Sequence, residues 1–376
     1  MITLYSSIVL LLTMMYLAVL VYLIKGWAAL KRPQFSGKPF STKITVMIAA
    51  RNEEENIRLT IEDILAQDYP KHLTEIIIAD DHSTDSTSAI IRSYAGQGIK
   101  LLQLNEKEKL NSYKKKAIAE IINLSSGDLL VATDADCRMG TQWLSSVVGY
   151  YETYNPVMIS SPVAYFQEKN LFERLQTLEF SYLIGIGAAF IGNGRASTCN
   201  GANFAYRKDV FHEVGGFKGI DDLASGDDEL LLQKVAERYP GKIGFLKAHA
   251  AVVYTHAKPN LKEFLQQRRR WASKSTKYKD KKVVALAVCI WLFNLSLLAN
   301  ALLSFYSISF LKLLVTQFVL KYLFEMMFLL PITSFFGRKR LTGWLILLSP
   351  IHVLYFVYIG LIGNTRKYAW KGRVVR

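Results

Sequence analysis

Apolar residues occur in short runs through the middle of the chain, separated by segments in which apolar positions follow a helical repeat. A short continuous apolar run predicts a strand that is buried on both faces, and a 3.6-residue repeat predicts an amphipathic helix. The pattern predicts strands at 44–50, 75–80, 99–104 and 128–133. It predicts helices at 56–67, 86–94 and 112–122. Strands that alternate with helices form right-handed crossovers, so we expect an α/β fold with a mainly parallel sheet and flanking helices.

Both ends of the chain are almost purely apolar. Residues 5–24 carry no charge, and about twenty such residues are enough to cross a bilayer as a helix. The basic residues Lys25, Lys31 and Arg32 follow this run rather than precede it, which favours an uncleaved anchor over a signal peptide. Cytoplasmic flanks of membrane helices are rich in Lys and Arg, so we expect the domain that follows in the cytosol.

Three further spans are predicted near 283–306, 311–335 and 341–363. Three spans after a cytosolic domain place the C-terminus outside, whereas the five basic residues of 364–376 place it inside. Pro350 lies in the middle of the last span, so a re-entrant hairpin is an open alternative there. Residues 170–192 are also long and apolar but carry charges, and they fit either an interfacial amphipathic helix or a buried core helix.

These patterns divide the chain into five parts, which we expect to belong to a multi-pass integral protein of a plasma or inner membrane. The parts are an N-terminal transmembrane anchor (1–27), a cytosolic catalytic domain (42–258), an interfacial helix (259–282), C-terminal transmembrane helices (283–363) and a basic tail (364–376).

The formal net charge of the 376-residue chain is +15, and it is unevenly distributed. Residues 258–282 hold ten Lys or Arg against two acids, so with the tail they account for +13 of the total. Both stretches adjoin apolar spans, so anionic lipid headgroups are expected partners and nucleic acid is not. The three cysteines, Cys137, Cys199 and Cys289, lack a C-x-x-C pair, which argues against a disulfide framework or zinc site and fits a reducing compartment.

Acidic residues follow two of the predicted strands. Asp80 and Asp81 follow one strand, and Asp134 and Asp136 follow another. The carboxyl ends of parallel strands meet at one edge of a sheet, where such folds bind ligands. Because side chains alternate along an extended chain, Asp134 and Asp136 point to one side and are candidate ligands for Mg²⁺ or Mn²⁺. Helix capping and turn formation are the alternative reading of such acids.

Two more motifs lie further along the chain. Asp227-Asp228-Glu229 precedes a predicted helix at 230–237; one of these acids is expected to cap that helix, and another is a candidate general base. Gln267-Arg268-Arg269-Arg270-Trp271 lies in a predicted helix that begins near residue 260. The Arg270 guanidinium suits phosphate oxygens and the Trp271 ring suits a sugar face, whereas we expect Arg268 and Arg269 to snorkel at the membrane surface.

Together these motifs resemble the membrane-integrated members of glycosyltransferase family 2, which include cellulose, chitin and hyaluronan synthases and ceramide glucosyltransferases. The resemblance covers residues 42–275 and extends to the flanking membrane helices. It implies a GT-A type fold and inverting transfer from a nucleotide sugar, a UDP-hexose or UDP-N-acetylhexosamine, to a membrane lipid or glycan, with Mg²⁺ or Mn²⁺ as cofactor. It implies Asp228 as the catalytic base and Asp136, beside Asp134, as the metal ligand. The substrate-binding positions that it implies are Ala50, Arg51, Glu53, Asp80, Asp81, Lys116, Asp134, Gln267, Arg270 and Trp271.

Two features depart from the polysaccharide synthases in this family. His256 stands where they commonly carry Glu, either as a structural residue or as a contact to acceptor or phosphate. The chain has about three spans after the catalytic domain, fewer than cellulose synthases, which favours a lipid or short-glycan acceptor over the alternative of a processive polysaccharide synthase.

Two other function classes are disfavoured. A nucleotidyltransferase needs further phosphate-binding loops, and the chain has no Gly-rich Walker pattern. Lys321 and Glu325 in an apolar span suit a non-enzymatic transporter or scaffold, but they equally suit a helix-packing pair. A non-enzyme with a decayed domain is expected to lack some of the acids, yet every expected acid is present.

Overall fold

The computed structural model describes residues 2–35, 37–106, 110–274, 281–362, 368–370 and 373–375. Within these residues a seven-stranded sheet has the order β3-β2-β1-β4-β8-β6-β9. Its parallel half consists of β1 (Ile44–Ala50), β2 (Thr74–Asp80), β3 (Ile99–Gln103) and β4 (Leu129–Ala132). Nearly every residue of β1, β2 and β4 is buried, as expected for strands covered on both faces. The predicted parallel sheet is confirmed, and each predicted strand matches the observed one to within a residue.

The other strands are shorter. β8 (Phe204–Arg207) runs antiparallel to β4 and to β6 (Met158–Ser160), and β9 (Ile243–Phe245) runs parallel to β6. A second, smaller sheet contains β5 (Arg138–Met139), β10 (Val253–Thr255) and β7 (Val163–Tyr165). The flanking helices are α2 (Ile57–Leu65), α3 (Thr87–Ser93), α4 (Tyr113–Leu124), α5 (Trp143–Tyr154), α7 (Lys208–Glu213) and α8 (Glu229–Arg238).

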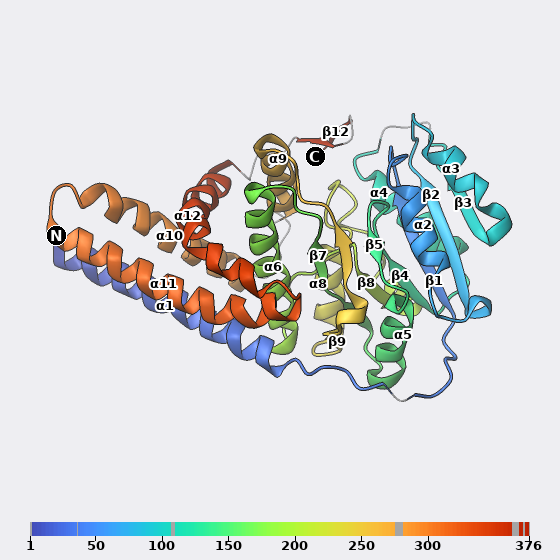
Figure 1. Ribbon diagram of the computed structural model, residues 1–376, viewed down its shortest axis with the longest axis horizontal. Helices are drawn as coiled ribbons and strands as arrows, with labels where there is room; N and C mark the ends of the chain where they lie inside the picture. The colour runs from blue at the N-terminus through green and yellow to red at the C-terminus, as the bar shows by residue number, and fades with distance from the viewer. Residues whose placement is uncertain are drawn as a thin grey trace.

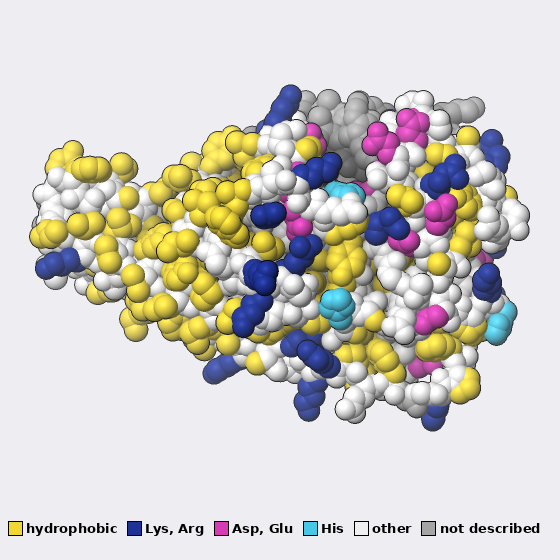
Figure 2. Space-filling view, viewed as in Figure 1, with side chains coloured by type: hydrophobic (Ala, Val, Ile, Leu, Met, Phe, Trp, Pro, Cys, Tyr) yellow, Lys and Arg dark blue, Asp and Glu magenta, His cyan; other side chains and the backbone are white. Residues whose placement is uncertain are grey.

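Within the described part of the chain, five helices are long and apolar enough to cross a membrane. They are α1 (Ile2–Ala29), α6 (Leu171–Gly192), α10 (Lys281–Leu303), α11 (Ile308–Phe335) and α12 (Leu345–Ile362). α1 and α11 lie side by side and extend away from the α/β domain (Figure 1). Hydrophobic side chains cover the outside of this bundle, and Lys and Arg side chains gather where the bundle meets the domain (Figure 2). This distribution fits a bundle in lipid with its basic border at the headgroups.

α6 lies crosswise between the bundle and the domain (Figure 1), with two thirds of its apolar window buried. Its contact with α1 is so close that only glycine fits. A Cβ on Gly26 would lie 2.0 Å from the Ala189 carbonyl oxygen, and a Cβ on Gly192 would lie 2.0 Å from the Gly26 carbonyl oxygen. The sequence predicts residues 170–192 as either an interfacial helix or a buried core helix. α6 has features of both, because it is largely buried and lies at the border of the bundle.

Polar residues inside the bundle pair with one another. The Lys321 ammonium lies 2.5 Å from a Glu325 carboxylate oxygen, and the Tyr16 hydroxyl of α1 donates to the same oxygen at 2.6 Å. All three side chains are almost fully buried. The ion pair lies within α11 and the Tyr16 hydroxyl joins it to α1, so these contacts fit a helix-packing pair.

The C-terminal part of the chain returns to the domain. α12 is one continuous helix through Pro350, so the re-entrant hairpin is not observed within it. It packs against α10 and also contacts α9 (Leu261–Ala272), the helix that follows the α/β domain. Strands β11 (Tyr368–Trp370) and β12 (Arg373–Val375) pair antiparallel, and β11 contacts α9. The rest of the predicted basic tail, and 275–280 of the predicted interfacial helix, lie outside the described residues.

Candidate active site

A cavity of about 520 Å³ opens at the carboxyl ends of β1, β2 and β4. The opposite wall is formed by α6, by α9 and by the loop before α8. Its lining includes almost all of the predicted site residues: Ala50, Arg51, Glu53, Asp81, Asp134, Asp136, Asp228, Gln267, Arg270 and Trp271. Asp80 and Lys116 are not among the lining residues. Asp80 is buried, and its carboxylate accepts the backbone N–H of Ser83, so it shapes the turn after β2.

The loops after β1 and β2 hold each other in place. One guanidinium nitrogen of Arg51 donates to the carbonyl oxygens of Asp81 and His82, each at 2.7 Å. His82 adopts a positive φ of 53°, a conformation that costs energy in most residues. These contacts fix the first edge of the cavity, where Arg51, Glu53 and Asp81 lie.

Asp134 and Asp136 fit a hard divalent cation. Oxygen atoms of both carboxylates and the sulfur of Cys137 lie within 4.8 Å of one another. Burial raises the pKa of the Cys137 thiol, and a sulfur ligand suits soft metals rather than Mg²⁺ or Mn²⁺. Two carboxylates leave the remaining positions of a six-coordinate Mg²⁺ or Mn²⁺ site open to substrate phosphate oxygens. The donor set therefore suits a metal that is held jointly by protein and diphosphate.

Three consecutive lysines of α4 point in three directions because each helical residue is rotated by about 100° from the last. Lys114 reaches the cavity, where its ammonium lies 2.7 Å from Asp134 and 3.2 Å from Asp227. Although burial alone would lower the pKa of Lys114, these two carboxylates raise it, so the side chain stays charged. Lys116 points outward and pairs with Glu120 at 2.5 Å. The structure thus places Lys114, rather than the predicted Lys116, beside the Asp-x-Asp motif.

Lys115, between them, supports the loop that leads to the third acidic group. Its ammonium donates to the carbonyl oxygens of Ile220, Leu223 and Ser225 at 2.6, 2.6 and 2.8 Å. Burial lowers the pKa of Lys115 to about 8. Because these bonds tie α4 to the loop, Asp227 and Asp228 are held opposite Asp134.

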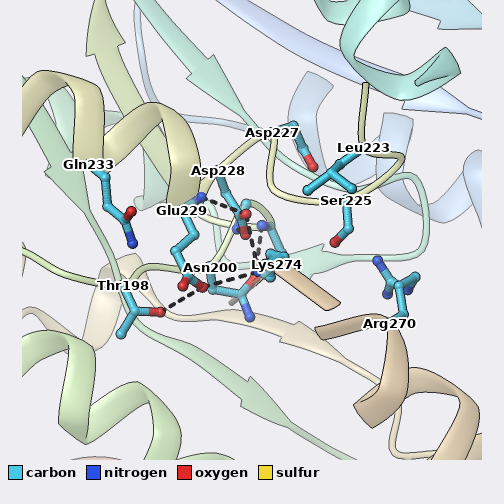
Figure 3. Close-up of polar contacts among 12 residues, drawn as sticks. Thr198, Asn200, Leu223, Ser225, Asp227, Asp228, Glu229, Gln233, Arg270 and Lys274 are labelled. Carbon is cyan, nitrogen blue, oxygen red and sulfur yellow. Dashed lines mark hydrogen bonds and ion pairs between the residues drawn. The ribbon is translucent and has the colours of Figure 1, made fainter. Parts of the chain in front are cut away.

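Asp228 is both a cavity residue and the N-cap of α8. One carboxylate oxygen accepts the backbone N–H of Glu229 at 2.6 Å, and the other accepts the N–H of Gly201 at 2.9 Å. The Lys274 ammonium lies 3.5 Å from Asp228 and 3.1 Å from Glu229 (Figure 3). Although burial alone would raise the pKa of Asp228, Lys274 and the backbone donors hold it below the ordinary aspartate range. Asp228 is therefore ionised at neutral pH.

α9 brings its polar face into the cavity. Gln267, Arg270 and Trp271 line it, as does Lys274, one turn after Arg270. The prediction that Arg268 snorkels is wrong, because its side chain is only 3% exposed. It forms a two-pronged ion pair with Glu179 of α6, at 3.1 and 2.5 Å, because α9 presents this position to the bundle rather than to the lipid surface.

Arg268 also orders the residues beside it. Its guanidinium lies between the rings of Phe264 and Trp271, at 4.5 and 4.3 Å from their centroids, and donates to the Gln267 side chain at 2.7 Å. His256, the departure from the polysaccharide synthases, lines the cavity and packs on Phe166, with ring centroids 4.5 Å apart.

Residues 45–215 match the family model described as glycosyl transferase family 2. This stretch is a glycosyl transferase family 2 domain. It includes β1 to β8 and the Asp-x-Asp motif, whereas Asp228 and α9 lie beyond the matched residues.

The chain resembles several curated proteins and solved structures. The Probable glycosyltransferase YdaM of Bacillus subtilis is 28% identical over 61% of this chain and 54% of its own length. A Beta-monoglucosyldiacylglycerol synthase of Nostoc is 26% identical over 48% of this chain and 39% of its own length. A Poly-beta-1,6-N-acetyl-D-glucosamine synthase of Staphylococcus epidermidis is 25% identical over 46% of this chain and 41% of its own length. The matches therefore span about half of these relatives or less.

The fold is similar to that of the mannosyltransferase PcManGT from Pyrobaculum calidifontis, solved in complex with GDP-Man and Mn²⁺. The two share a TM-score of 0.62 and 19% identity, over 93% of this chain and 99% of the other. This likeness confirms the predicted GT-A type of fold.

Replacing Lys114 by methionine tests the different positions of the α4 lysines. We expect Lys114→Met to lower sugar transfer by about 10²-fold or more, because it removes a fixed positive charge from the cavity. Lys116→Met is the matched control, since it removes the same charge two residues away on the outer face and should change the rate by less than about threefold. Initial rates with a radiolabelled nucleotide sugar make the comparison. Equal losses in the two variants would contradict the placement of Lys114.

Proposed function

We propose that this chain is an inverting, metal-dependent glycosyltransferase that moves a sugar from a nucleotide sugar to a membrane-held acceptor. One observation supports it most. A single cavity beside the membrane helices joins the Asp134 and Asp136 pair, the ionised Asp228, and the basic residues Lys114 and Arg270. A carboxylate that accepts a proton, facing a site for a phosphate-bound cation, is what glycosyl transfer from a diphosphate requires.

In this reaction Asp228 accepts the proton of an acceptor hydroxyl while the acceptor oxygen bonds to the anomeric carbon of the sugar. The bond from that carbon to the diphosphate breaks, and the nucleoside diphosphate leaves. This single displacement inverts the anomeric configuration. A divalent cation on Asp134 and Asp136, when bound, supplies positive charge to the departing diphosphate. Lys114 and Arg270 add fixed positive charge, and Trp271 offers a flat face to a sugar ring.

A lipid acceptor is favoured by how the bundle is filled. Tyr16 and Phe293 stack with centroids 4.1 Å apart between α1 and α10, and Phe293 and Phe328 are fully buried. Such packing stabilises a helix bundle but leaves little room along its axis for a growing polymer. Polysaccharide synthesis is the alternative, and relatives of both kinds resemble the chain. We place the catalytic domain on the cytosolic face, with its basic border at anionic headgroups.

The enzyme is tested by incubating the full chain, in membranes, with labelled UDP-glucose, UDP-N-acetylglucosamine or UDP-galactose and Mn²⁺. We expect one donor to be consumed and its label to enter a product. A product that extracts into organic solvent indicates a glycolipid, and a product that stays in the aqueous phase indicates a polysaccharide. If no donor is turned over with metal and lipid present, the proposal is wrong.

Removing the metal should stop transfer. Chelation with EDTA, and separately Asp136→Ala, are expected to lower the rate by about 10²-fold or more, because the leaving diphosphate loses its counter-charge. Added Mn²⁺ or Mg²⁺ should restore the chelated wild type but not the variant. Glu120→Gln is the control, since Glu120 is an acid on the outer face of α4. Full activity in EDTA would contradict metal dependence.

A further inference from the structure

A second cavity, of about 880 Å³, lies on the other side of the loop that precedes β8. We call it the α1–α10 groove. It is lined by α1 and α10, by the end of α6 and by α8, and the first three are each long and apolar enough to cross a membrane. Its lining includes Ala18, Val19 and Tyr22 of α1, Phe190 and Ile191 of α6, Leu230 and Gln233 of α8, and Val283 and Leu286 of α10.

The groove changes character along its length. The side formed by α1 and α10 contributes Ala18, Val19, Val283 and Leu286, all of them aliphatic. Since α1 and α10 are long and apolar enough to cross a membrane, we infer that this side of the groove borders the hydrocarbon region of a bilayer. It therefore suits a hydrocarbon chain that enters from the membrane.

The other side offers hydrogen-bond donors. The Tyr22 hydroxyl oxygen is buried and has no hydrogen-bond partner among the described residues. Arg195, in the loop after α6, also lines the groove and is exposed. A buried hydroxyl without a partner is uncommon in native structures. A headgroup rich in acceptor oxygens would satisfy both side chains.

Only a thin wall separates this groove from the active site. Ser197 and Gln233 line the groove, and the Gln233 side chain donates to the Ser197 carbonyl oxygen at 3.1 Å. The next residue, Thr198, lines the active-site cavity and donates to Glu229 at 3.0 Å (Figure 3). α8 thus begins with Asp228 in one cavity and presents Gln233 to the other.

We propose that the α1–α10 groove binds the acceptor lipid of the transfer reaction. The hydrocarbon chain lies between α1 and α10, the oxygen-rich headgroup meets Tyr22 and Arg195, and its hydroxyl lies against Ser197, the neighbour of Thr198 in the active-site cavity. The ligand class is a membrane lipid with a hydroxyl-bearing headgroup. This inference rests on the proposed function, and it adds the side from which the acceptor approaches.

The first test is kinetic. Ala18→Trp fills the aliphatic side of the groove, and Tyr22→Phe removes the unpartnered hydroxyl without changing the shape of the ring. We expect each to raise the KM for a diacylglycerol acceptor by about tenfold or more. Leu10→Trp is the matched control, because it places the same bulk on an exposed face of α1 outside the groove. If both groove variants match the control while the wild type is active, the groove is not the acceptor site.

The second test needs no turnover. The full chain is placed in phosphatidylcholine nanodiscs with a trace of diacylglycerol that carries a photoreactive diazirine in its acyl chain. We expect labelled peptides from α1 and α10, and less label in Ala18→Trp than in Leu10→Trp. Excess unlabelled diacylglycerol should compete, whereas phosphatidylglycerol should not. Equal competition by phosphatidylglycerol would mean that the groove holds bulk anionic lipid, and would overturn the assignment even if transfer is observed.

Discussion

Asp228→Asn is expected to lower sugar transfer by about 10²- to 10⁴-fold, the usual contribution of a general base. The variant removes the proton acceptor but keeps an oxygen at the N-cap of α8, and asparagine caps helices as well as aspartate does. The fold and the donor site should therefore be retained. Initial rates, and the affinity for UDP by isothermal titration calorimetry, separate the two effects.

Two outcomes would contradict the role of Asp228. Loss of UDP binding in Asp228→Asn would mean that the carboxylate holds the donor site together through Lys274 and Gly201. A rate close to that of the wild type would mean that another residue is the general base. Asp227, which pairs with Lys114, is the acid to test next.

Arg268→Ala is expected to destabilise the protein by about 3 to 5 kcal/mol, the usual cost of removing one partner from a buried ion pair. The Glu179 carboxylate would stay buried in α6 without its counter-charge, and Trp271 would lose the guanidinium packed on its ring. Thermal unfolding in detergent, followed by intrinsic fluorescence, measures the loss.

The controls for Arg268 lie on the same pair of helices. Lys262→Ala removes an exposed basic residue of α9 and should change stability by less than about 0.5 kcal/mol. The double variant Arg268→Met with Glu179→Leu should recover much of the stability, because neither charge is then left unpaired. A single variant as stable as Lys262→Ala would show that the ion pair contributes little to the folded state.

The strands that could be predicted are those whose own residues decide their structure. β1, β2 and β4 are covered on both faces, so each is a short unbroken apolar run in the sequence. β6, β8 and β9 contain only three or four residues each. Such segments form strands because neighbours in the sheet pair with them, and that information is not local.

The site could be predicted where a motif fixes both the residue and its direction. Asp134 and Asp136 share a side of an extended segment, and Gln267 and Arg270 share a side of a helix. The choice among Lys114, Lys115 and Lys116 depends on how α4 is rotated against β1 and β2, which consecutive lysines do not reveal. Lys274 was missed although it lies four residues after Arg270, a spacing that places it on the same helical face.

The contact of β11 with α9 helps to determine on which side of the membrane the C-terminus lies. Among the described helices, α1, α10 and α11 run between the domain and the far end of the bundle (Figure 1). α12 begins beside the domain, and the strand that follows it, β11, contacts α9. With α6 lying crosswise, the number of complete passages is then odd, and the two termini are expected on opposite sides of the bilayer. Strands β11 and β12 would then lie on the same side of the bilayer as α9 and the catalytic domain. Three apolar segments after the domain and a positively charged C-terminal segment on the same side as the domain are then compatible expectations, because α12 is not counted as a complete passage.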